Sequence, residues 1–153
     1  MEYSDNILHA AYIKHAYTHA KAHSKCHTQC SAIIVSGLMG VALAAENFSL
    51  DEWYRSSAIT NLFYKAAHKG VPCSGMDIYC PLTPTLEDVI AMREVGINSF
   101  TFHKNVMDKY FDKWETGKEL KFLEENGILV RCWSGKVSKK NIDVKIRGDI
   151  FYP

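Results

Sequence analysis

The sequence has no strong excess of charge of either sign and no long apolar run. Its 18 lysine and arginine residues and 17 aspartate and glutamate residues leave a formal net charge of +1, so the basic surplus typical of nucleic-acid-binding proteins is missing. No apolar run approaches the roughly 20 residues that a membrane-spanning helix needs. The first residues, Met1–Asp5, lack the basic and apolar regions of a signal peptide. We therefore expect a cytoplasmic protein without a membrane segment or a nucleic-acid partner.

Cysteine is too scarce and too irregularly spaced for a disulfide framework. The chain has five cysteines, an odd number, and in the cytoplasm we expect them to be reduced thiols. Cys26 and Cys30 lie on either side of His27, but a four-coordinate zinc site would need further ligands supplied by the fold. Because free cysteines are among the most buried residues, we expect neither a metal nor another cofactor. Cys26 and Cys30 remain the alternative metal ligands.

The sequence does have the composition of a globular domain, with 47% apolar and 23% charged residues. Apolar residues recur at helical spacing in some segments, and short apolar runs end at glycine, proline or polar residues in others. This spacing predicts helices over residues 6–25, 54–69, 85–95, 106–114 and 118–125. It predicts strands over residues 31–35, 40–45, 76–80, 99–103 and 128–133, and a loop over residues 46–52.

The order of these elements predicts their arrangement. A strand hairpin followed by alternating helices and strands is typical of a mixed sheet with helices on both faces. We expect a single domain over residues 1–153, with a core of about residues 6–133 and a tail of residues 134–153. In the tail, Val144 and Ile146 alternate with charged residues, a pattern that fits an additional edge strand.

The helix predicted over residues 85–95 has strong terminal signals. Thr85 followed by Asp88 is the capping-box pattern, in which each side chain bonds the backbone N–H of the other residue. Pro84 precedes the helix and Gly96 ends it. The capping box by itself explains both Thr85 and Asp88. The alternative is that this helix N-terminus and the Thr85 hydroxyl hold an anion such as a nucleotide phosphate.

Several segments, taken in order, resemble the cytidine/deoxycytidylate deaminase family. The resemblance is carried by Ala32-Ile33-Ile34-Val35, Asn47, Asn61, Ala66-Ala67, Gly70, Gly75-Met76-Asp77-Ile78-Tyr79, Pro84, Val89-Ile90, Gly96-Ile97 and Gly127-Ile128-Leu129-Val130. It covers about residues 8–133. It implies an α/β protein with the three-layer α/β/α cytidine-deaminase-like fold, in which a mixed five-stranded sheet has helices on both faces.

The residues that bind the metal in that family are replaced in this sequence. Zinc deaminases have H-x-E on one helix and P-C-x-x-C on the next. Alignment on the segments above places Ser57 at the zinc-binding histidine, and Thr85 and Asp88 at the two cysteines. Two hydroxyls and one carboxylate make a poor zinc site, because neutral hydroxyls bind the ion weakly.

The residue that moves protons is replaced as well. Ile59 stands at the position of the glutamate that acts as general acid and base. A shifted alignment does not restore the motif, because residues 51–65 contain no histidine or cysteine and their only carboxylates, Asp51 and Glu52, precede the helix. Without an acidified water and a proton carrier, we expect no catalytic residue and no hydrolytic deamination by the mechanism of that family.

The polar and aromatic residues around these positions indicate a binding site. Trp53-Tyr54-Arg55 lies where the resemblance implies the mouth of the pocket, and such a cluster can stack on a base and pair with a phosphate. The alternative is that Trp53 packs in the protein and Arg55 lies on the surface without a ligand. The candidate ligand-binding residues are Asn47, Trp53, Arg55, Ser57, Asn61 and Thr85.

These observations predict a catalytically inactive relative of the deaminases that retains a nucleotide pocket. Such a protein would act as a binder of a nucleotide or nucleotide-derived signal, or as a regulator, and we expect it to form a homo-oligomer. Two alternatives remain open. The fold is a scaffold for protein contacts with no ligand, or the chain is an active deaminase-type hydrolase with a relocated metal site.

Overall fold

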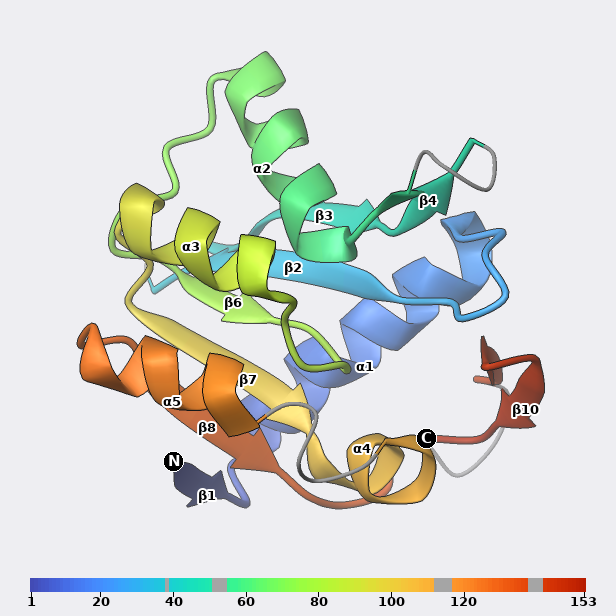
Figure 1. Cartoon of the computed structure of the whole chain (residues 1–153). Coiled ribbons are helices and arrows are strands. Elements are labelled where there is room, and N and C mark those ends of the chain that lie inside the picture. The colour runs from blue at the N-terminus through green and yellow to red at the C-terminus, as the bar shows by residue number, and fades with distance from the viewer. Residues whose placement is uncertain (38, 51–54, 112–116, 138–141) are drawn as a thin grey trace.

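A six-stranded mixed sheet lies at the centre of the protein, with the strand order β1-β8-β7-β6-β2-β3 (Figure 1). The computed structural model describes residues 1–37, 39–50, 55–111, 117–137 and 142–153. The strands of the sheet are β1 (Glu2–Ser4), β2 (Ser31–Ser36), β3 (Gly40–Glu46), β6 (Asp77–Tyr79), β7 (Ser99–His103) and β8 (Leu129–Trp133).

The sheet is mixed, as the order of the predicted elements indicates. Strands β1, β8, β7 and β6 run parallel, whereas β2 is antiparallel to both β6 and β3. All five predicted strands are present, but the expected count of five is wrong because β1 adds a sixth. In β1, Glu2 pairs with Arg131 and Ser4 pairs with Trp133. A three-residue strand is too short to show an alternating pattern, so only its pairing with β8 defines it.

Helices cover both faces of the sheet, which confirms the three-layer α/β/α fold (Figure 1). Helix α1 (Ile7–His23) packs against β2, β6 and β7 on one face. Helices α2 (Ala58–Lys69), α3 (Leu86–Val95) and α5 (Gly117–Glu125) form the layer on the other face. The short helix α4 (Lys104–Tyr110) follows β7. In the described part of the chain, no helix has both the length and the apolar character needed to cross a bilayer.

The segment before α2 differs from its prediction. The helix predicted over residues 54–69 begins only at Ala58, with Ser57 as its N-cap. Ahead of it, β5 (Arg55–Ser56) pairs with β4 (Phe48–Ser49), which lies inside the predicted loop. A pair of two-residue strands leaves no periodic signal in the sequence, so the pairing is visible only in the fold.

The tail forms a hairpin of its own. Strand β9 (Val144–Ile146) pairs with β10 (Asp149–Phe151) in a separate two-stranded sheet, so the expected edge strand of the main sheet is not formed. The turn of the hairpin contains Gly148, whose φ of 87° favours glycine. The backbone N–H of Gly148 donates to His27 O at 3.1 Å, which attaches the hairpin to the segment before β2.

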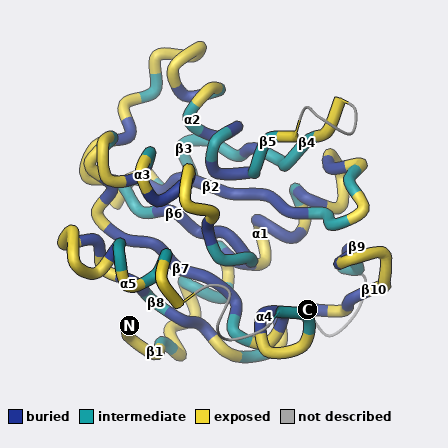
Figure 2. Tube along the Cα trace, viewed as in Figure 1, coloured by how far each residue is buried: buried dark blue, intermediate teal, exposed yellow. Residues whose placement is uncertain are grey.

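The core extends from the sheet to this tail (Figure 2). The ring of Phe151 packs against those of Tyr17 and His103, with centroids 6.2 Å and 6.4 Å away. His103 Nε2 lies 3.0 Å from Gly135 O, so it donates, and Nδ1 accepts from the Tyr17 hydroxyl at 2.7 Å. Burial lowers the pKa of His103 to about 4. The imidazole is therefore a neutral, fully paired part of the core.

Candidate functional site

The N-termini of α2 and α3 meet at one carboxylate, that of Asp88. Ser57 caps α2, where its Oγ accepts from Thr60 N at 2.9 Å. Thr85 caps α3, where its Oγ1 accepts from Asp88 N at 3.2 Å and its own N–H donates to Asp88 Oδ2 at 2.9 Å. The predicted capping box is thereby confirmed.

Three side-chain hydroxyls complete the contacts of Asp88. Ser57 Oγ and Thr60 Oγ1 both donate to Oδ1, the latter at 2.9 Å. Thr85 Oγ1 donates to Oδ2 at 2.9 Å. Together with the Thr85 N–H, these hydroxyls supply a donor for each of the roughly four acceptor positions of a carboxylate. Asp88 is only 1% exposed, so its charge is stabilised by the chain itself and it joins α2 to α3.

The resemblance to zinc deaminases implies a metal at this place, and the residues present do not fit one. A catalytic zinc takes three nitrogen, sulfur or carboxylate ligands, whereas Ser57 and Thr85 offer neutral hydroxyls and the acceptor positions of Asp88 are already used. Among the described residues, no group of three or more His, Cys, Asp or Glu side chains could hold a metal ion. Ile59, at the position of the proton-carrying glutamate, is 2% exposed and belongs to the core.

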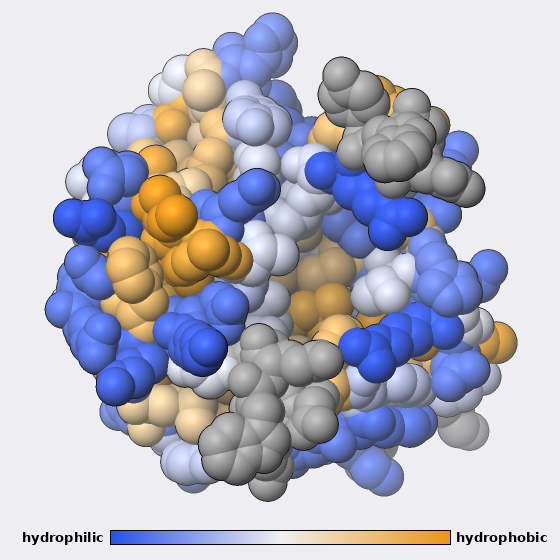
Figure 3. Space-filling model, viewed as in Figure 1, coloured by the Kyte–Doolittle hydropathy of each residue, from blue (hydrophilic) through white to orange (hydrophobic). Residues whose placement is uncertain are grey.

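An open cleft with a volume of about 860 Å³ lies over this network. Figure 3 shows this face of the molecule hollowed near its centre. The hydroxyl-bearing residues Ser57, Thr60 and Thr85 all line the cleft, and we call them the hydroxyl floor. The other described lining residues are Asn47, Phe48, Arg55, Ser56, Tyr64, Leu86 and Glu87. The cleft thus combines hydroxyls with aromatic, apolar and charged groups.

A second hollow, of about 430 Å³, adjoins the cleft. Asn47, Phe48, Arg55 and Ser56 line both hollows, and Cys26, His27, Thr28 and Ser49 complete the second one. Among the described lining residues of the two hollows, Arg55 is the only lysine or arginine. Its exposed side chain is therefore the permanent cation beside the cleft.

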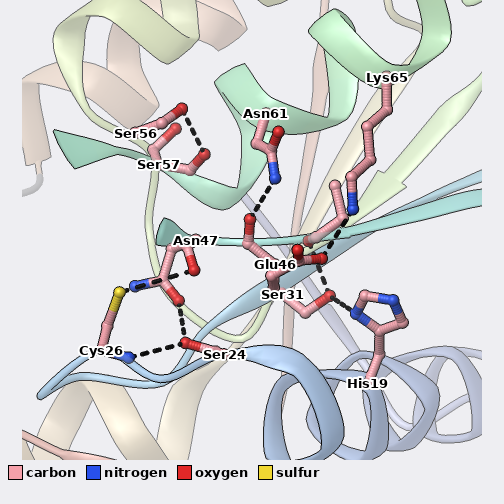
Figure 4. A network of polar contacts seen from close by, with 11 residues as sticks. His19, Ser24, Cys26, Ser31, Glu46, Asn47, Ser56, Ser57, Asn61 and Lys65 are labelled. Atoms are coloured by element: carbon pink, nitrogen blue, oxygen red, sulfur yellow. Dashed lines mark hydrogen bonds and ion pairs between the residues drawn. The ribbon is translucent and has the colours of Figure 1, made fainter. Parts of the chain in front are cut away.

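Asn47 connects the end of β3 to the segment that precedes β2 (Figure 4). Its Oδ1 accepts from Ser24 Oγ at 2.7 Å and from Cys30 N at 2.9 Å, while Nδ2 donates to Thr28 O at 2.7 Å. The amide group of Asn47 is thus held in one orientation, and among the described residues one N–H of its four hydrogen-bonding positions has no partner.

Asn61 lies behind the wall of the cleft and is 7% exposed. Its Nδ2 donates to Glu46 O at 2.7 Å, and Glu46 Oε2 pairs with Lys65 Nζ at 2.8 Å (Figure 4). Burial acts to raise the pKa of Glu46, but the hydrogen bond and charge of Lys65, a backbone hydrogen bond and the charge of His19 together outweigh burial and lower that pKa. These contacts tie α2 to the end of β3.

Cys26 and Cys30 have different partners. Cys26 is half-buried, and its Sγ lies 3.6 Å from Asn47 O. Cys30 is buried, and its Sγ lies 3.4 Å from Sγ of Cys80, also a free thiol. The contact with Cys30 and burial raise the pKa of Cys80 well above its usual value. The two thiols therefore contact different neighbours, Asn47 O for Cys26 and Cys80 Sγ for Cys30.

Most of the predicted ligand-binding residues come together at the cleft. Asn47, Arg55, Ser57 and Thr85 line it, Asn61 lies behind its wall, and Trp53 is outside the described residues. Sequence reasoning missed Thr60, which lines the cleft and donates to Asp88. The available signal was its position three residues after Ser57, which places both hydroxyls on one side of a helix.

No protein-family model and no curated protein sequence matches this chain. Solved structures do match it in fold. The dCMP deaminase from the cyanophage S-TIM5 in apo form superposes with a TM-score of 0.67 at 14% identity, over 84% of this chain and 99% of that chain. The same enzyme in complex with dCMP and dUMP gives a TM-score of 0.66 at 14% identity, over 84% of this chain and 98% of that chain.

A bifunctional enzyme has the same fold in one part of its chain. The diaminohydroxyphosphoribosylaminopyrimidine deaminase and reductase from Thermotoga maritima matches with a TM-score of 0.62 at 17% identity, over 82% of this chain and 36% of that chain. At these identities the comparisons show the fold, which is that of the cytidine/deoxycytidylate deaminases.

Proposed function

We propose that this chain binds a nucleotide in the cleft above the hydroxyl floor and does not deaminate it by zinc chemistry. The observation that carries the proposal is the set of hydrogen bonds that the Asp88 carboxylate accepts where α2 and α3 meet. Their donors are the hydroxyls of Ser57, Thr60 and Thr85. A neighbour of the same fold holds dCMP and dUMP, which supports a nucleotide as the class of ligand.

The cleft contains groups suited to the phosphate and to the base of a nucleotide. The Arg55 guanidinium can form paired hydrogen bonds with a phosphate. The rings of Phe48 and Tyr64, which both line the cleft, offer surfaces for a base, and the Tyr64 side chain is 65% exposed. In this proposal Asn47, Ser57 and Thr85 contact the ligand directly, Asn61 supports them from behind, and Trp53 remains a candidate ligand-binding residue.

The same residues argue against hydrolysis. Ile59 cannot carry a proton, and the carboxylate of Asp88 is buried and fully hydrogen-bonded. Glu87 is the one carboxylate among the described residues that line the cleft, and it is exposed. An exposed carboxylate without an acidified water supplies no strong nucleophile.

The proposal includes the role and the assembly of the protein. A binder that does not consume its ligand suits a sensor or a regulatory subunit in the cytoplasm, and it needs no cofactor. We also propose that the chain forms a homo-oligomer. In support, Leu86 and Ile90 on α3 are 60% and 45% exposed, and apolar side chains gather over this helix in Figure 3. Light scattering on the purified protein measures the assembly, and a monomer at all concentrations would contradict this part.

The experiment combines metal analysis with ligand binding. Tag-free protein, purified without chelator, is analysed for zinc by plasma mass spectrometry and then heated with a panel of nucleoside monophosphates. We expect zinc far below one per chain in folded protein. With a nucleotide at about 100 times its Kd we expect the Tm to rise by several degrees, because a ligand that binds only the folded state stabilises it.

Either of two results would overturn the proposal. One zinc per chain, with turnover of dCMP or cytidine, would identify an active hydrolase with a relocated metal. A Tm unchanged by every nucleotide would favour a scaffold that acts through protein contacts alone.

A further inference from the structure

Each of the three residues of the hydroxyl floor uses its only hydroxyl proton in a hydrogen bond to Asp88. A serine or threonine hydroxyl has one proton to donate and two lone pairs to accept with. Ser57 Oγ and Thr60 Oγ1 donate to Asp88 Oδ1, and Thr85 Oγ1 donates to Asp88 Oδ2. An ionised carboxylate only accepts hydrogen bonds, so all three protons point into the protein and away from the cleft.

The hydroxyl floor therefore offers the cleft lone pairs and no protons. One lone pair of Ser57 Oγ is used by Thr60 N, and one of Thr85 Oγ1 by Asp88 N. In the described part of the chain no donor reaches Thr60 Oγ1, which leaves both of its lone pairs available. Every oxygen of the hydroxyl floor can thus accept a hydrogen bond from a ligand, and none can donate one.

We propose that the hydroxyl floor selects the ligand by the direction of its hydrogen bonds. Ser57, Thr60 and Thr85 are the specificity-determining residues: they accept from an amino group of the base and repel a carbonyl oxygen in the same position. Asp88 is the positioning residue, because its carboxylate sets the direction of all three hydroxyls. The inference rests on the proposed function, since it concerns the ligand of that same cleft.

The physical basis is the free-energy cost of placing a carbonyl oxygen of the ligand against hydroxyl oxygens when neither side has a proton to donate. A carbonyl oxygen placed against the hydroxyl floor would lose its hydrogen bonds to water and face only lone pairs. The hydroxyls cannot rotate to donate without leaving the buried Asp88 carboxylate short of a donor. A site of this kind rejects the wrong ligand more strongly than it attracts the right one.

Matched nucleotide pairs test the proposal by titration calorimetry. AMP and IMP differ in an amino group against a carbonyl at one ring position, and CMP and UMP differ in the same way. We expect the amino member of the preferred pair to bind about tenfold or more tightly than its carbonyl partner. Equal affinities within a pair would overturn this inference and leave the proposed function standing. Failure of all four nucleotides to bind would overturn the proposed function itself.

Two substitutions of Thr60 separate the direction of hydrogen bonds from the shape of the cleft. Thr60→Val removes the acceptor at nearly constant volume, so we expect the ratio of amino to carbonyl affinity to fall at least threefold, because the amino member loses an acceptor and the carbonyl member is repelled less. Thr60→Ser keeps the hydroxyl and the contact with Asp88 and should keep the ratio. An unchanged ratio in Thr60→Val would contradict a selecting role for this hydroxyl.

Asp88→Asn gives the sharpest test, because it should reverse the preference. The N–H of Thr85 holds the amide oxygen at the position of Oδ2, which places the amide NH₂ opposite Ser57 and Thr60. These two hydroxyls then accept from the amide and turn their protons toward the cleft, so the carbonyl member should gain affinity relative to the amino member. A variant that stays folded and keeps the original ratio would overturn the inference. If it does not fold, the Thr60 pair still decides.

Discussion

The hydroxyl of Ser57, at the start of α2, donates a hydrogen bond to the carboxylate of Asp88, in the first turn of α3. The two residues are 31 positions apart in the chain. Because Thr85 bonds the same carboxylate through its N–H and its hydroxyl, one side chain joins the N-cap residues of two helices. The contacts that hold the fold together here are the same ones that shape the cleft.

Asp88→Ala should therefore destabilise the protein strongly. The substitution removes the acceptor for four donors, and we expect the free energy of unfolding to fall by about 3 kcal/mol or more. Urea unfolding followed by circular dichroism measures the change. Glu94→Ala, an exposed carboxylate on the same helix, is the control and should stay within about 0.5 kcal/mol of the wild type. Similar losses in the two variants would contradict a special role for Asp88.

Stability should depend on pH through His103. Its folded-state pKa of about 4 lies below the unfolded value of 6.5, so the unfolded state binds a proton first as the pH falls. The stabilisation is fully present above pH 6.5 and is lost as the pH falls toward 4, by up to about 3 kcal/mol. Burial also lowers the pKa values of His9 and His19, which act in the same direction. The contribution of His103 alone is therefore found by comparing the wild type with His103→Gln, which keeps His9 and His19.

Urea unfolding at pH 7.5 and pH 5 measures this dependence. The wild type should lose clearly more stability between these two pH values than His103→Gln does. Equal losses in the two proteins would show that the burial of His103 does not carry the effect.

Thiol reactivity should distinguish Cys26 from the other cysteines. Cys26 is half-buried, whereas Cys30, Cys73, Cys80 and Cys132 are buried, and burial raises the pKa of Cys132 to about 11. Since the thiolate is the reactive form, an aromatic disulfide reagent should modify one thiol per native chain quickly and the rest slowly. Cys26→Ser should abolish the fast phase. A fast phase that persists in this variant would come from one of the other four cysteines and would contradict its burial.

Arg55→Ala should weaken the binding of a nucleoside monophosphate and spare the nucleoside. Loss of a charged hydrogen bond to phosphate lowers affinity by about tenfold or more, and the difference between wild type and variant should shrink at high salt. Lys69→Ala removes an exposed cation at the far end of α2 and is the matched control. Calorimetric titration with both ligands gives the comparison. Equal losses for nucleoside and nucleotide would place the phosphate elsewhere.

Two glycine substitutions test how firmly the tail is attached. Gly148 has φ +87°, and a Cβ there would meet His27 Cε1 at 2.5 Å, whereas Gly40 has φ +71° with nothing within 4 Å. Gly40→Ala should cost about 1 kcal/mol of stability from backbone strain alone. Gly148→Ala should cost at least as much, because the exposed ring of His27 must also turn away from the added methyl group. Thermal unfolding measures both, and a smaller cost for Gly148→Ala than for Gly40→Ala would contradict a close contact between the hairpin and His27.

Local signals predicted the regular elements well. The capping box of Thr85 and Asp88, the buried run of β2 and the glycine that ends α3 depend on residues within a few positions of each other, so a single sequence reveals them. The signals gave no indication of β1 or β10, and they found β9 by its alternation but assigned it to the edge of the main sheet. These strands have three residues each, and only the partner determines where such a short strand pairs.

The candidate site divides in the same way. The order of elements and the residues at Ser57, Ile59, Thr85 and Asp88 were readable in the sequence by themselves, and with them the loss of the deaminase motifs. The tertiary structure alone decided that Ser57 and Thr60 reach the Asp88 carboxylate. A helix cap is set by neighbours in the chain, whereas a hydrogen bond between two helices depends on how the sheet beneath them brings them together.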